Sequence, residues 1–312
     1  MSVIKDLNEI EKPLINPVLT IGNFDGVHRG HLALFDRVKK LAADIQGQSV
    51  VMTFEPHPIK IVKPGNGPPL ITPVEQKLKL IADAGIDVIL CLPFNREFAA
   101  ITAEDFVNEL LVKKIGVKEI VVGYDYTFGA GRKGNIDFLK KMGDKLGFRV
   151  HVVEPIHLNS TLVSSTSIRN LVKEGNLPEA KRLLGRDYQI TGIVKTGMGR
   201  GSSILGFPTA NLTPVDELIP KKGVYAVKAY IHDKEYDGVC NIGVNPTFGG
   251  TALSIETHVL DFSGDIVGER FTIKFISRLR EEKTFNGKDE LAEEIKKDII
   301  KAREILEMNG KQ

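Results

Sequence analysis

The sequence predicts two domains of different class: an N-terminal α/β domain with a mostly parallel sheet, and a C-terminal antiparallel β-barrel with a terminal helix. At 312 residues the chain is about twice as long as a typical domain. Short apolar runs alternate with helical patterns in the first half, whereas apolar and polar residues alternate singly after about Tyr188. We expect the boundary near Gly185 to Gln189, which gives domains 1–185 and 186–312.

Five apolar runs of the first half are predicted to be buried strands, each separated from the next by a helical or loop pattern. One helical pattern has Thr72 as its expected N-cap, Pro73 in the first turn and Glu75 at the capping-box position. Repeated strand–helix alternation is typical of a parallel sheet covered by helices, in which ligands bind beyond the carboxyl ends of the strands. We therefore look for chemistry in the loops that follow strands. The predicted strands span 18–24, 50–54, 87–93, 119–124 and 148–153.

The second half is predicted to be an antiparallel sheet or small barrel. Its runs VYAVKAYI, EYDGVCNIGV, LSIETHVLDF and RFTIKFI alternate apolar and polar residues and are separated by Gly, Asp and Asn turns. The last pattern, over about 288–308, is an amphipathic helix. Its apolar residues Leu291, Ile295, Ile299 and Ile305 lie near one face.

The composition is that of an ordinary globular protein with nearly balanced charge. The chain has 42 Lys and Arg residues and 40 Asp and Glu residues, so its net charge is +2. A nucleic-acid-binding protein would usually be more basic, so nucleic acid is not an expected partner. The first residues lack the apolar core of a signal peptide, and no run approaches the roughly 18 apolar residues of a membrane span. Cys91 and Cys240 lie far apart in apolar runs, which predicts buried packing residues. We expect a soluble cytoplasmic protein with no membrane partner, a monomer or weak homo-oligomer.

The stretch GNFDGVHRGH, residues 22–31, follows the first predicted strand and precedes a helix expected to begin near Gly30. Glycines let an anion approach the backbone, and the N–H groups at a helix start favour one. His28 and His31 can donate hydrogen bonds to phosphoryl oxygens that gain charge in a transition state. Residue chemistry alone leaves two alternatives open, a metal site or incidental loop histidines. The P-loop pattern GxxxxGK[ST] does not occur in the chain.

Three further loops lie where the carboxyl ends of strands should face one crevice: TFEPHP at 53–58, VGYDYTFGAGRKG at 122–134 and VSSTSIRNLV at 163–172. TFEPHP could be only a proline-rich turn, and SSTSIR only an N-cap with a solvated Arg169. The carboxylate of Asp125 would repel a phosphate but would accept hydrogen bonds from ribose hydroxyls or an amino group, so we assign it to the nucleoside side.

These motifs resemble the nucleotidyltransferase superfamily, through HxGH, and more narrowly the FMN adenylyltransferase module of bacterial bifunctional riboflavin kinase/FAD synthetases, through GxFDGxHxGH. The resemblance implies a Rossmann-like domain that joins FMN to the AMP part of ATP and releases pyrophosphate. It implies that His28, His31 and Arg169 are catalytic. For ATP binding it implies Gly22, Phe24, Asp25, Gly30, Gly123, Asp125, Ser164, Ser165 and Thr166, and for flavin binding Phe54, His57, Pro58 and Phe128.

A second glycine-rich element, GMGRGSSILGFPTANL at 197–212, leads to no helix, and its glycines could serve only the turns of a barrel hairpin. Its FPTAN segment places Thr209 and Asn211 on one side of an extended stretch. Such hard oxygen ligands suit a magnesium ion that also binds ATP phosphates. Glu256, in the run SIETHVLDF, is the other candidate, although a single acid in a strand is usually an exposed edge residue.

GFPTANL resembles a motif of riboflavin kinases, and the resemblance to the bifunctional family spans about residues 17–300. It implies that Glu256 acts as general base on the riboflavin 5′-hydroxyl while Thr209 and Asn211 hold Mg²⁺ with ATP. Arg280 fits the kinase arginine best, with Arg278 as the alternative. The resemblance implies Gly197, Gly199, Gly201, Gly206, Pro208 and Asn245 for ATP binding in the kinase, and Arg280 and Phe285 for flavin binding.

The sequence therefore predicts a bifunctional enzyme whose partners are riboflavin, FMN, FAD and ATP with Mg²⁺. Three alternative functions explain less of the sequence. A cytidylyltransferase of the same superfamily would leave TFEPHP and the whole second half unexplained. A flavin sensor would have no need of His28, His31, Thr209, Asn211 and Glu256 together. A nucleic-acid-binding barrel would be expected to carry a basic surface and clustered aromatics.

Overall fold

The computed structural model describes residues 2–10, 13–65, 67–195, 209–212, 217–232, 234–244, 253–285 and 287–309. Two compact units are formed, Met1–Ser165 and Thr166–Gln312. The division falls at the start of helix α7 (Ser165–Glu174), before helix α8 (Leu177–Leu184). The domain boundary expected near residue 185 stays a prediction.

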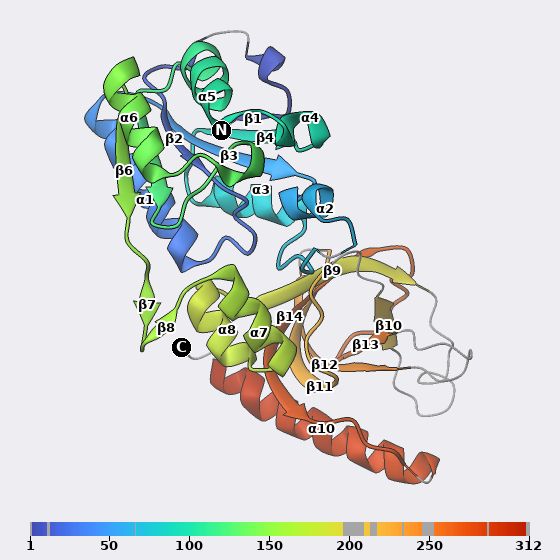
Figure 1. The fold of residues 1–312 in the computed structure, drawn as a ribbon. Helices are drawn as coiled ribbons and strands as arrows, with labels where there is room; N and C mark the ends of the chain where they lie inside the picture. The colour runs from blue at the N-terminus through green and yellow to red at the C-terminus, as the bar shows by residue number, and fades with distance from the viewer. Residues whose placement is uncertain are drawn as a thin grey trace. The chain divides into compact units, whose positions relative to one another are not determined.

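The first unit contains a six-stranded sheet in the order β1-β4-β3-β2-β5-β6, with every pair parallel (Figure 1). All five predicted strands are present, and β2 ends at Ile21, three residues earlier than expected. The sequence did not indicate β1, whose three residues are too few to show a period. The strands are β1 (Ser2–Ile4), β2 (Val18–Ile21), β3 (Ser49–Glu55), β4 (Val88–Pro93), β5 (Glu119–Gly123) and β6 (Arg149–Val153).

Both faces of this sheet are covered, as parallel sheets require. Side chains at alternate strand positions, such as Leu19 and Met52, pack with the π-helix η2 and with α6. Their neighbours Val18 and Val51 pack on the opposite face with α1 and α3. The helices are η1 (Leu7–Glu9), α1 (Arg29–Asp44), α2 (Pro58–Val62), α3 (Val74–Asp83), α4 (Arg96–Ala99), α5 (Ala103–Asp105), η2 (Phe106–Ile115), η3 (Ala130–Arg132) and α6 (Ile136–Leu146), and a small hairpin joins β7 (His157–Leu158) to β8 (Thr161–Leu162).

The strand order makes β2 the centre of the first unit. The chain passes from β2 to β3 and β4 on one side and then returns to β5 and β6 on the other. At such a reversal the loops that follow the two central strands diverge and open a crevice at the carboxyl ends. The loops after β2 and β5 are the GNFDGVHRGH and YDYTFGAGRKG stretches.

The second unit is built on a closed antiparallel barrel in the order β10-β13-β12-β11-β14-β9 (Figure 1). This confirms the predicted α/β domain followed by a barrel. Inside the barrel the rings of Tyr188 and Tyr225 lie 6.2 Å and 5.4 Å from that of Phe275. The strands are β9 (Tyr188–Lys195), β10 (Thr209–Leu212), β11 (Gly223–Ile231), β12 (Lys234–Val244), β13 (Leu253–Val259) and β14 (Arg270–Arg280).

Helix α10 (Lys288–Asn309) covers β11, β12 and β14, and it agrees closely with the predicted terminal helix. Ala302 and Leu306 are buried against Val224 of β11, with Ile299 and Ile305 packed beside them. The amphipathic face of the helix is therefore used to close the outside of the barrel.

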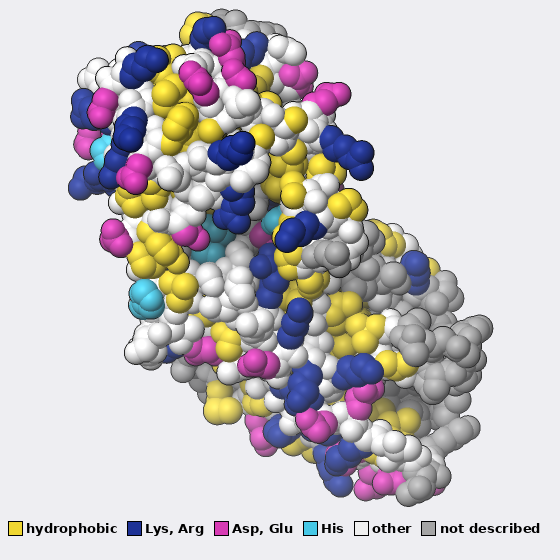
Figure 2. All heavy atoms as spheres, viewed as in Figure 1, with side chains coloured by type: hydrophobic (Ala, Val, Ile, Leu, Met, Phe, Trp, Pro, Cys, Tyr) yellow, Lys and Arg dark blue, Asp and Glu magenta, His cyan; other side chains and the backbone are white. Residues whose placement is uncertain are grey.

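The remaining expectations from composition concern cysteines, charge and membranes. Cys91 and Cys240 are free and buried, as predicted. Lys and Arg side chains are mixed with Asp and Glu over much of the face shown in Figure 2. Within the described part of the chain, no helix is both long and apolar enough to span a bilayer.

Candidate functional site

The two histidines of GNFDGVHRGH begin helix α1 and cap it. His28 is the N-cap, and its Nδ1 accepts a hydrogen bond from the His31 backbone N–H at 3.3 Å. In return, His31 Nδ1 accepts from the His28 N–H at 3.4 Å. The two rings stack with centroids 3.6 Å apart. This reciprocal capping box gives each histidine a structural role that the sequence did not indicate.

The capping also determines which ring nitrogen carries the proton. A nitrogen that accepts a hydrogen bond has no proton, so a neutral imidazole held in this way is protonated at Nε2. His28 and His31 are therefore arranged as Nε2–H donors at the positive end of the α1 dipole.

Phe24 and Asp25 are buried beside the histidines, and their expected contacts with ATP stay predictions. The Phe24 ring meets the edge of His31 at 5.2 Å and that of Phe35 at 5.0 Å. The Asp25 carboxylate accepts hydrogen bonds from the backbone N–H groups of Ile71 and Thr72 at 3.0–3.1 Å. Phe24 thus packs against His31, and Asp25 fixes the loop to the segment at 71–72.

Thr72 is not the N-cap of α3, so that prediction was wrong. Pro73 occupies the cap position, and no side chain caps the helix there. The Thr72 hydroxyl lies instead 3.4 Å from Asp25 Oδ1 and accepts from the Gly26 N–H at 3.0 Å. A buried carboxylate competes successfully for a hydroxyl that sequence rules assign to the helix.

A cavity of about 610 Å³ lies beside the loops that follow β2, β3, β4 and β5. It brings together all four residues predicted for flavin binding and two of those predicted for ATP binding. Its volume and mainly apolar lining are typical of small-molecule sites. His28 and His31 are not among the lining residues. The predicted residues that line it are Phe54, His57, Pro58 and Phe128 for the flavin, and Gly22 and Asp125 for ATP.

The loop after β4 supplies part of this cavity, and our sequence reasoning missed it. Phe94 and Phe98 line the wall, with their rings 5.6 Å and 5.3 Å from that of Phe54. Phe106 continues this aromatic wall to Phe128, with the ring centroids 5.4 Å apart. The rule that ligands bind beyond the carboxyl ends of parallel strands applies equally to this loop, so the signal was present.

Two ionisable groups support the cavity wall. Lys77 of α3 is buried, and its Nζ donates to the Phe54 carbonyl oxygen at 3.0 Å. Burial lowers the pKa of Lys77, although the charges of Glu55 and Asp25 oppose this effect. Burial raises the pKa of Tyr126, a lining residue, so its phenol stays protonated at neutral pH.

The SSTSIR motif begins α7. The Ser165 hydroxyl donates to the Asp25 carbonyl oxygen at 2.8 Å, which links this motif to the histidine loop. Arg169 is buried with 9% of its surface exposed, so the alternative of a solvated arginine is wrong. Ser164 is half-buried and Thr166 exposed. Thr166 and Arg169 belong to the second unit, and their expected contacts with ATP stay predictions.

On the barrel, Thr209, Asn211 and Glu256 lie on one face. Residues two apart on a strand share a face, and Asn211 is directly paired with Glu256 of β13. The neighbouring residues Ala210 and Ile255 are buried inside the barrel. The three predicted kinase residues therefore form a half-buried polar group on the outer surface.

Glu256 is not an edge residue, because β13 lies between β10 and β12 in the closed barrel. Asn241 of β12 pairs with it on the side away from Asn211. The Ser254 hydroxyl donates to Glu256 Oε1 at 2.8 Å, which orients the carboxylate. The other residues predicted for the kinase nucleotide lie outside the described residues. They are Gly197, Gly199, Gly201, Gly206, Pro208 and Asn245.

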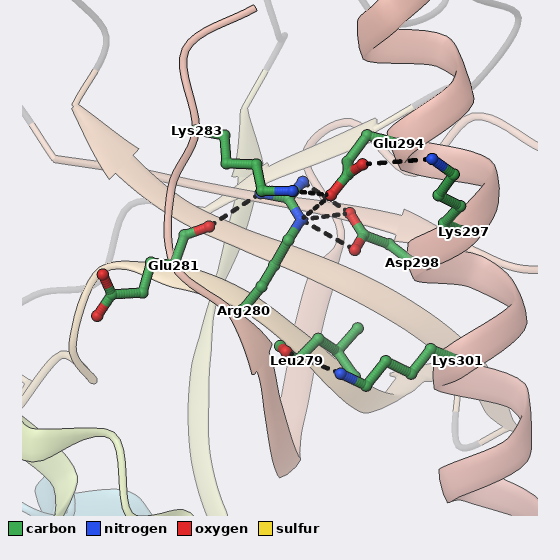
Figure 3. Close-up of polar contacts among 8 residues, drawn as sticks. All are labelled: Leu279, Arg280, Glu281, Lys283, Glu294, Lys297, Asp298 and Lys301. Carbon is green, nitrogen blue, oxygen red and sulfur yellow. Dashed lines mark hydrogen bonds and ion pairs between the residues drawn. The ribbon is translucent and has the colours of Figure 1, made fainter.

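Arg280, expected to bind the flavin, is held by carboxylates of α10 (Figure 3). Its Nε and Nη2 contact the Asp298 carboxylate at 2.7–3.1 Å, and its Nε lies 3.5 Å from Glu294. The guanidinium also lies over the Phe285 ring, 5.8 Å from its centroid. A hydrogen bond from Lys283 lowers the pKa of Glu294, and the positive charge of Arg280 lowers it further. Arg280 thus fastens the end of β14 to the terminal helix.

Arg278, the alternative kinase arginine, is turned toward other groups. Its Nη2 donates to the Lys222 carbonyl oxygen at 2.6 Å, and its Nη1 lies 3.6 Å from Glu281. Its Nε is buried and finds no hydrogen-bond partner among the residues that the structure describes. The structure therefore distinguishes a helix-bound Arg280 from a loop-bound Arg278.

Among the described residues, no group of three or more His, Cys, Asp or Glu side chains is arranged to hold a metal ion. The pair Thr209 and Asn211 supplies a hydroxyl and an amide oxygen on one face, which are donors that Mg²⁺ accepts alongside phosphate oxygens.

Known proteins resemble this chain in both halves. The model of the FAD synthetase family matches residues 11–167, and that of the riboflavin kinase family matches residues 184–306. A bifunctional riboflavin kinase/FMN adenylyltransferase of Escherichia coli (strain K12) is 38% identical over 308 residues, 98% of each chain. One of Listeria monocytogenes serovar 1/2a is 39% identical over 287 residues, 91% of this chain and 90% of the relative.

The crystal structure of a Streptococcus pneumoniae protein described as a macrolide-efflux protein also matches. Its TM-score is 0.87 at 33% identity, and the match covers 97% of this chain and 98% of that one. The description as a macrolide-efflux protein applies to the Streptococcus pneumoniae protein and not to this chain.

The ion pair between Arg280 and Asp298 is expected to stabilise the fold. Asp298→Ala leaves a half-buried arginine without its main partner and should lower the free energy of unfolding by about 3–5 kcal/mol. Urea unfolding followed by circular dichroism measures this, since the chain contains no Trp. Glu281→Ala, which removes an exposed carboxylate, is the control and should leave the midpoint unchanged. Equal urea midpoints for the two variants would show that the Arg280–Asp298 ion pair does not stabilise the fold.

Proposed function

The chain belongs to the family of bifunctional riboflavin kinase/FMN adenylyltransferases, and from this premise we propose how its residues divide the two reactions. The C-terminal barrel phosphorylates riboflavin to FMN with ATP. The N-terminal domain transfers the AMP part of ATP to FMN, which yields FAD and pyrophosphate. The observation that carries the assignment is the cavity of about 610 Å³, in which the predicted flavin and nucleotide loops meet.

In the adenylyl transfer, the FMN phosphate oxygen attacks the α-phosphorus of ATP, and the bond to the β-phosphate oxygen breaks. The nucleophile is already an anion, so no general base is needed. The barrier comes from bringing two anions together, and donors placed where charge develops lower it. His28 and His31 fit this role as Nε2–H donors, since their Nδ1 atoms are used in the capping box.

The flavin ring fits the aromatic wall of the cavity. Phe54, Phe98, Phe106 and Phe128 offer apolar faces and edges to an isoalloxazine, which stacks on such rings. Asp125, exposed at the cavity, is assigned to the nucleoside, whose hydroxyls and amino group it can accept from. Gly22 directly follows β2 and lets the ligand approach the backbone.

In the kinase reaction, Glu256 takes the proton of the riboflavin 5′-hydroxyl as that oxygen attacks the γ-phosphorus of ATP. Ser254 orients the carboxylate, and Asn211 lies beside it on β10. Mg²⁺, when bound with ATP by Thr209 and Asn211, would neutralise phosphate charge. Arg280 and Phe285 stay our proposal for the flavin side, with Arg280 acting from the end of β14.

The expected setting is the cytosol. Two buried free thiols suit a reducing compartment, and the nearly balanced charge supports small molecules rather than nucleic acid as partners. A monomer or weak homo-oligomer remains our proposal for the state in solution.

The direct test is to incubate the purified protein with riboflavin, ATP and Mg²⁺ and to separate the flavins by chromatography. FMN and then FAD should form, and replacing Mg²⁺ with a chelator should suppress both because ATP phosphates then keep their full charge. If riboflavin is recovered unchanged with Mg²⁺ present, the proposed function is wrong.

Glu256→Gln should stop the first reaction alone. Gln keeps the size of the side chain but cannot accept the hydroxyl proton, so FMN formation should fall by about 10²–10⁴-fold. FAD formation from supplied FMN serves as the control in the same sample and should persist. A variant that still phosphorylates riboflavin at the normal rate would rule out Glu256 as the base.

His28→Ala should have the opposite effect. Loss of one donor to the transition state should lower FAD formation from FMN by about 10²–10³-fold, while FMN formation from riboflavin continues. Both rates are read from one chromatogram. If folded His28→Ala protein loses both activities, the division of labour between the two domains is wrong.

A further inference from the structure

The loop between β2 and α1 has a strained backbone. Phe24 and Val27 have φ angles of 49° and 37°, a region that side chains with a Cβ rarely adopt, least of all a β-branched one. Gly26, between them, has a φ of 89°. Such strain persists only where surrounding contacts enforce it, and it is concentrated at functional sites. Here the strained residues immediately precede the capping His28.

Asp25 and Thr72 supply the enforcing contacts. The Asp25 side chain is buried, with 4% of the residue exposed, and it accepts from the N–H groups of Ile71 and Thr72. The Thr72 hydroxyl lies within hydrogen-bond distance of Asp25 Oδ1 and accepts from the Gly26 N–H. One hydroxyl therefore joins the carboxylate to the loop backbone, two residues before His28.

Ser165 adds a third contact by donating to the Asp25 carbonyl oxygen at 2.8 Å. The backbone of Asp25 and Gly26 is thus held on both sides, between the segment at 70–72 and the start of α7. We name this set of contacts, made by Asp25, Thr72 and Ser165, the Asp25 clamp.

We propose that the Asp25 clamp positions His28 and His31 for adenylyl transfer, with Asp25 and Thr72 as positioning residues that do not touch the substrates. This inference rests on the proposed function of the two histidines. The loop can reach the strained conformation that starts α1 at His28 only while Gly26 is held. Donors that stabilise a transition state must be placed to within a fraction of an ångström, so a relaxed loop would cost rate.

Asp25 itself is unsuited to binding ATP phosphates. Its two oxygens already accept from backbone N–H groups, and its negative charge would repel an anion. Its effect on the reaction is therefore indirect and passes through Gly26 and His28.

The test uses three threonine variants of the full chain. Thr72→Val removes the hydroxyl, and Thr72→Ser restores it without the methyl group. Thr20→Val is the matched control, because Thr20 is fully buried in β2 and its hydroxyl has no partner among the described residues. FAD formation from FMN is measured as kcat and KM. FMN formation from riboflavin shows that the kinase domain of the same chain is intact.

For Thr72→Val we expect kcat for FAD formation to fall by about 10–100-fold with KM for FMN nearly unchanged, because positioning and not binding is lost. Thr72→Ser should recover most of the rate, Thr20→Val should keep it, and riboflavin phosphorylation should be normal in all three.

Three results would overturn the proposal: a normal kcat in Thr72→Val, an equal loss in Thr72→Ser, or an equal loss in Thr20→Val. The first of these results would overturn the proposal even if KM rose, since the clamp would then serve binding. If the wild-type chain makes no FAD from FMN, the proposed function itself fails, and the role of the clamp fails with it.

Discussion

The parallel pairing of β2 with β3 on one side and β5 on the other is the constraint on which the N-terminal site depends. Because the chain leaves β2 in one direction and later returns to its opposite edge, the loops at the carboxyl ends of β2 and β5 cannot pack on each other. The space between them becomes the aromatic cavity, and the start of α1 lies beside it. The residues that line this cavity lie at the ends of the strands β2, β3, β4 and β5 or follow them.

In the barrel, the register of the antiparallel strands brings the predicted kinase residues together. Antiparallel pairing places Asn211, Glu256 and Asn241 opposite one another on three neighbouring strands, so side chains distant in sequence share one face. Closure of the barrel removes the strand edges, and β13 is paired on both sides. A carboxylate on such a surface is held by neighbouring polar groups while it stays accessible, which suits a general base.

Several motif residues serve the fold as much as the chemistry. His28 and His31 cap a helix with the same rings that we assign to phosphate, and this capping is what selects the protonated nitrogen. Arg280 is bound by Asp298 and Glu294, so a residue that resembles a ligand contact also closes the terminal helix onto the barrel. A sequence motif in this protein therefore marks a joint requirement of folding and function.

The sequence by itself determined the two fold classes, five of the six parallel strands and the terminal helix, because hydrophobic periodicity is a local property. It also pointed to the residues that meet in the cavity, since loops after parallel strands share one edge. Only the tertiary structure decided that Asp25 and Thr72 bind the loop backbone, that Phe94 and Phe98 extend the aromatic wall, and that Arg280 pairs with α10. Those partners lie far apart in the sequence or in loops that carry no recognisable motif. Burial and hydrogen bonding between them exist only once the elements have packed.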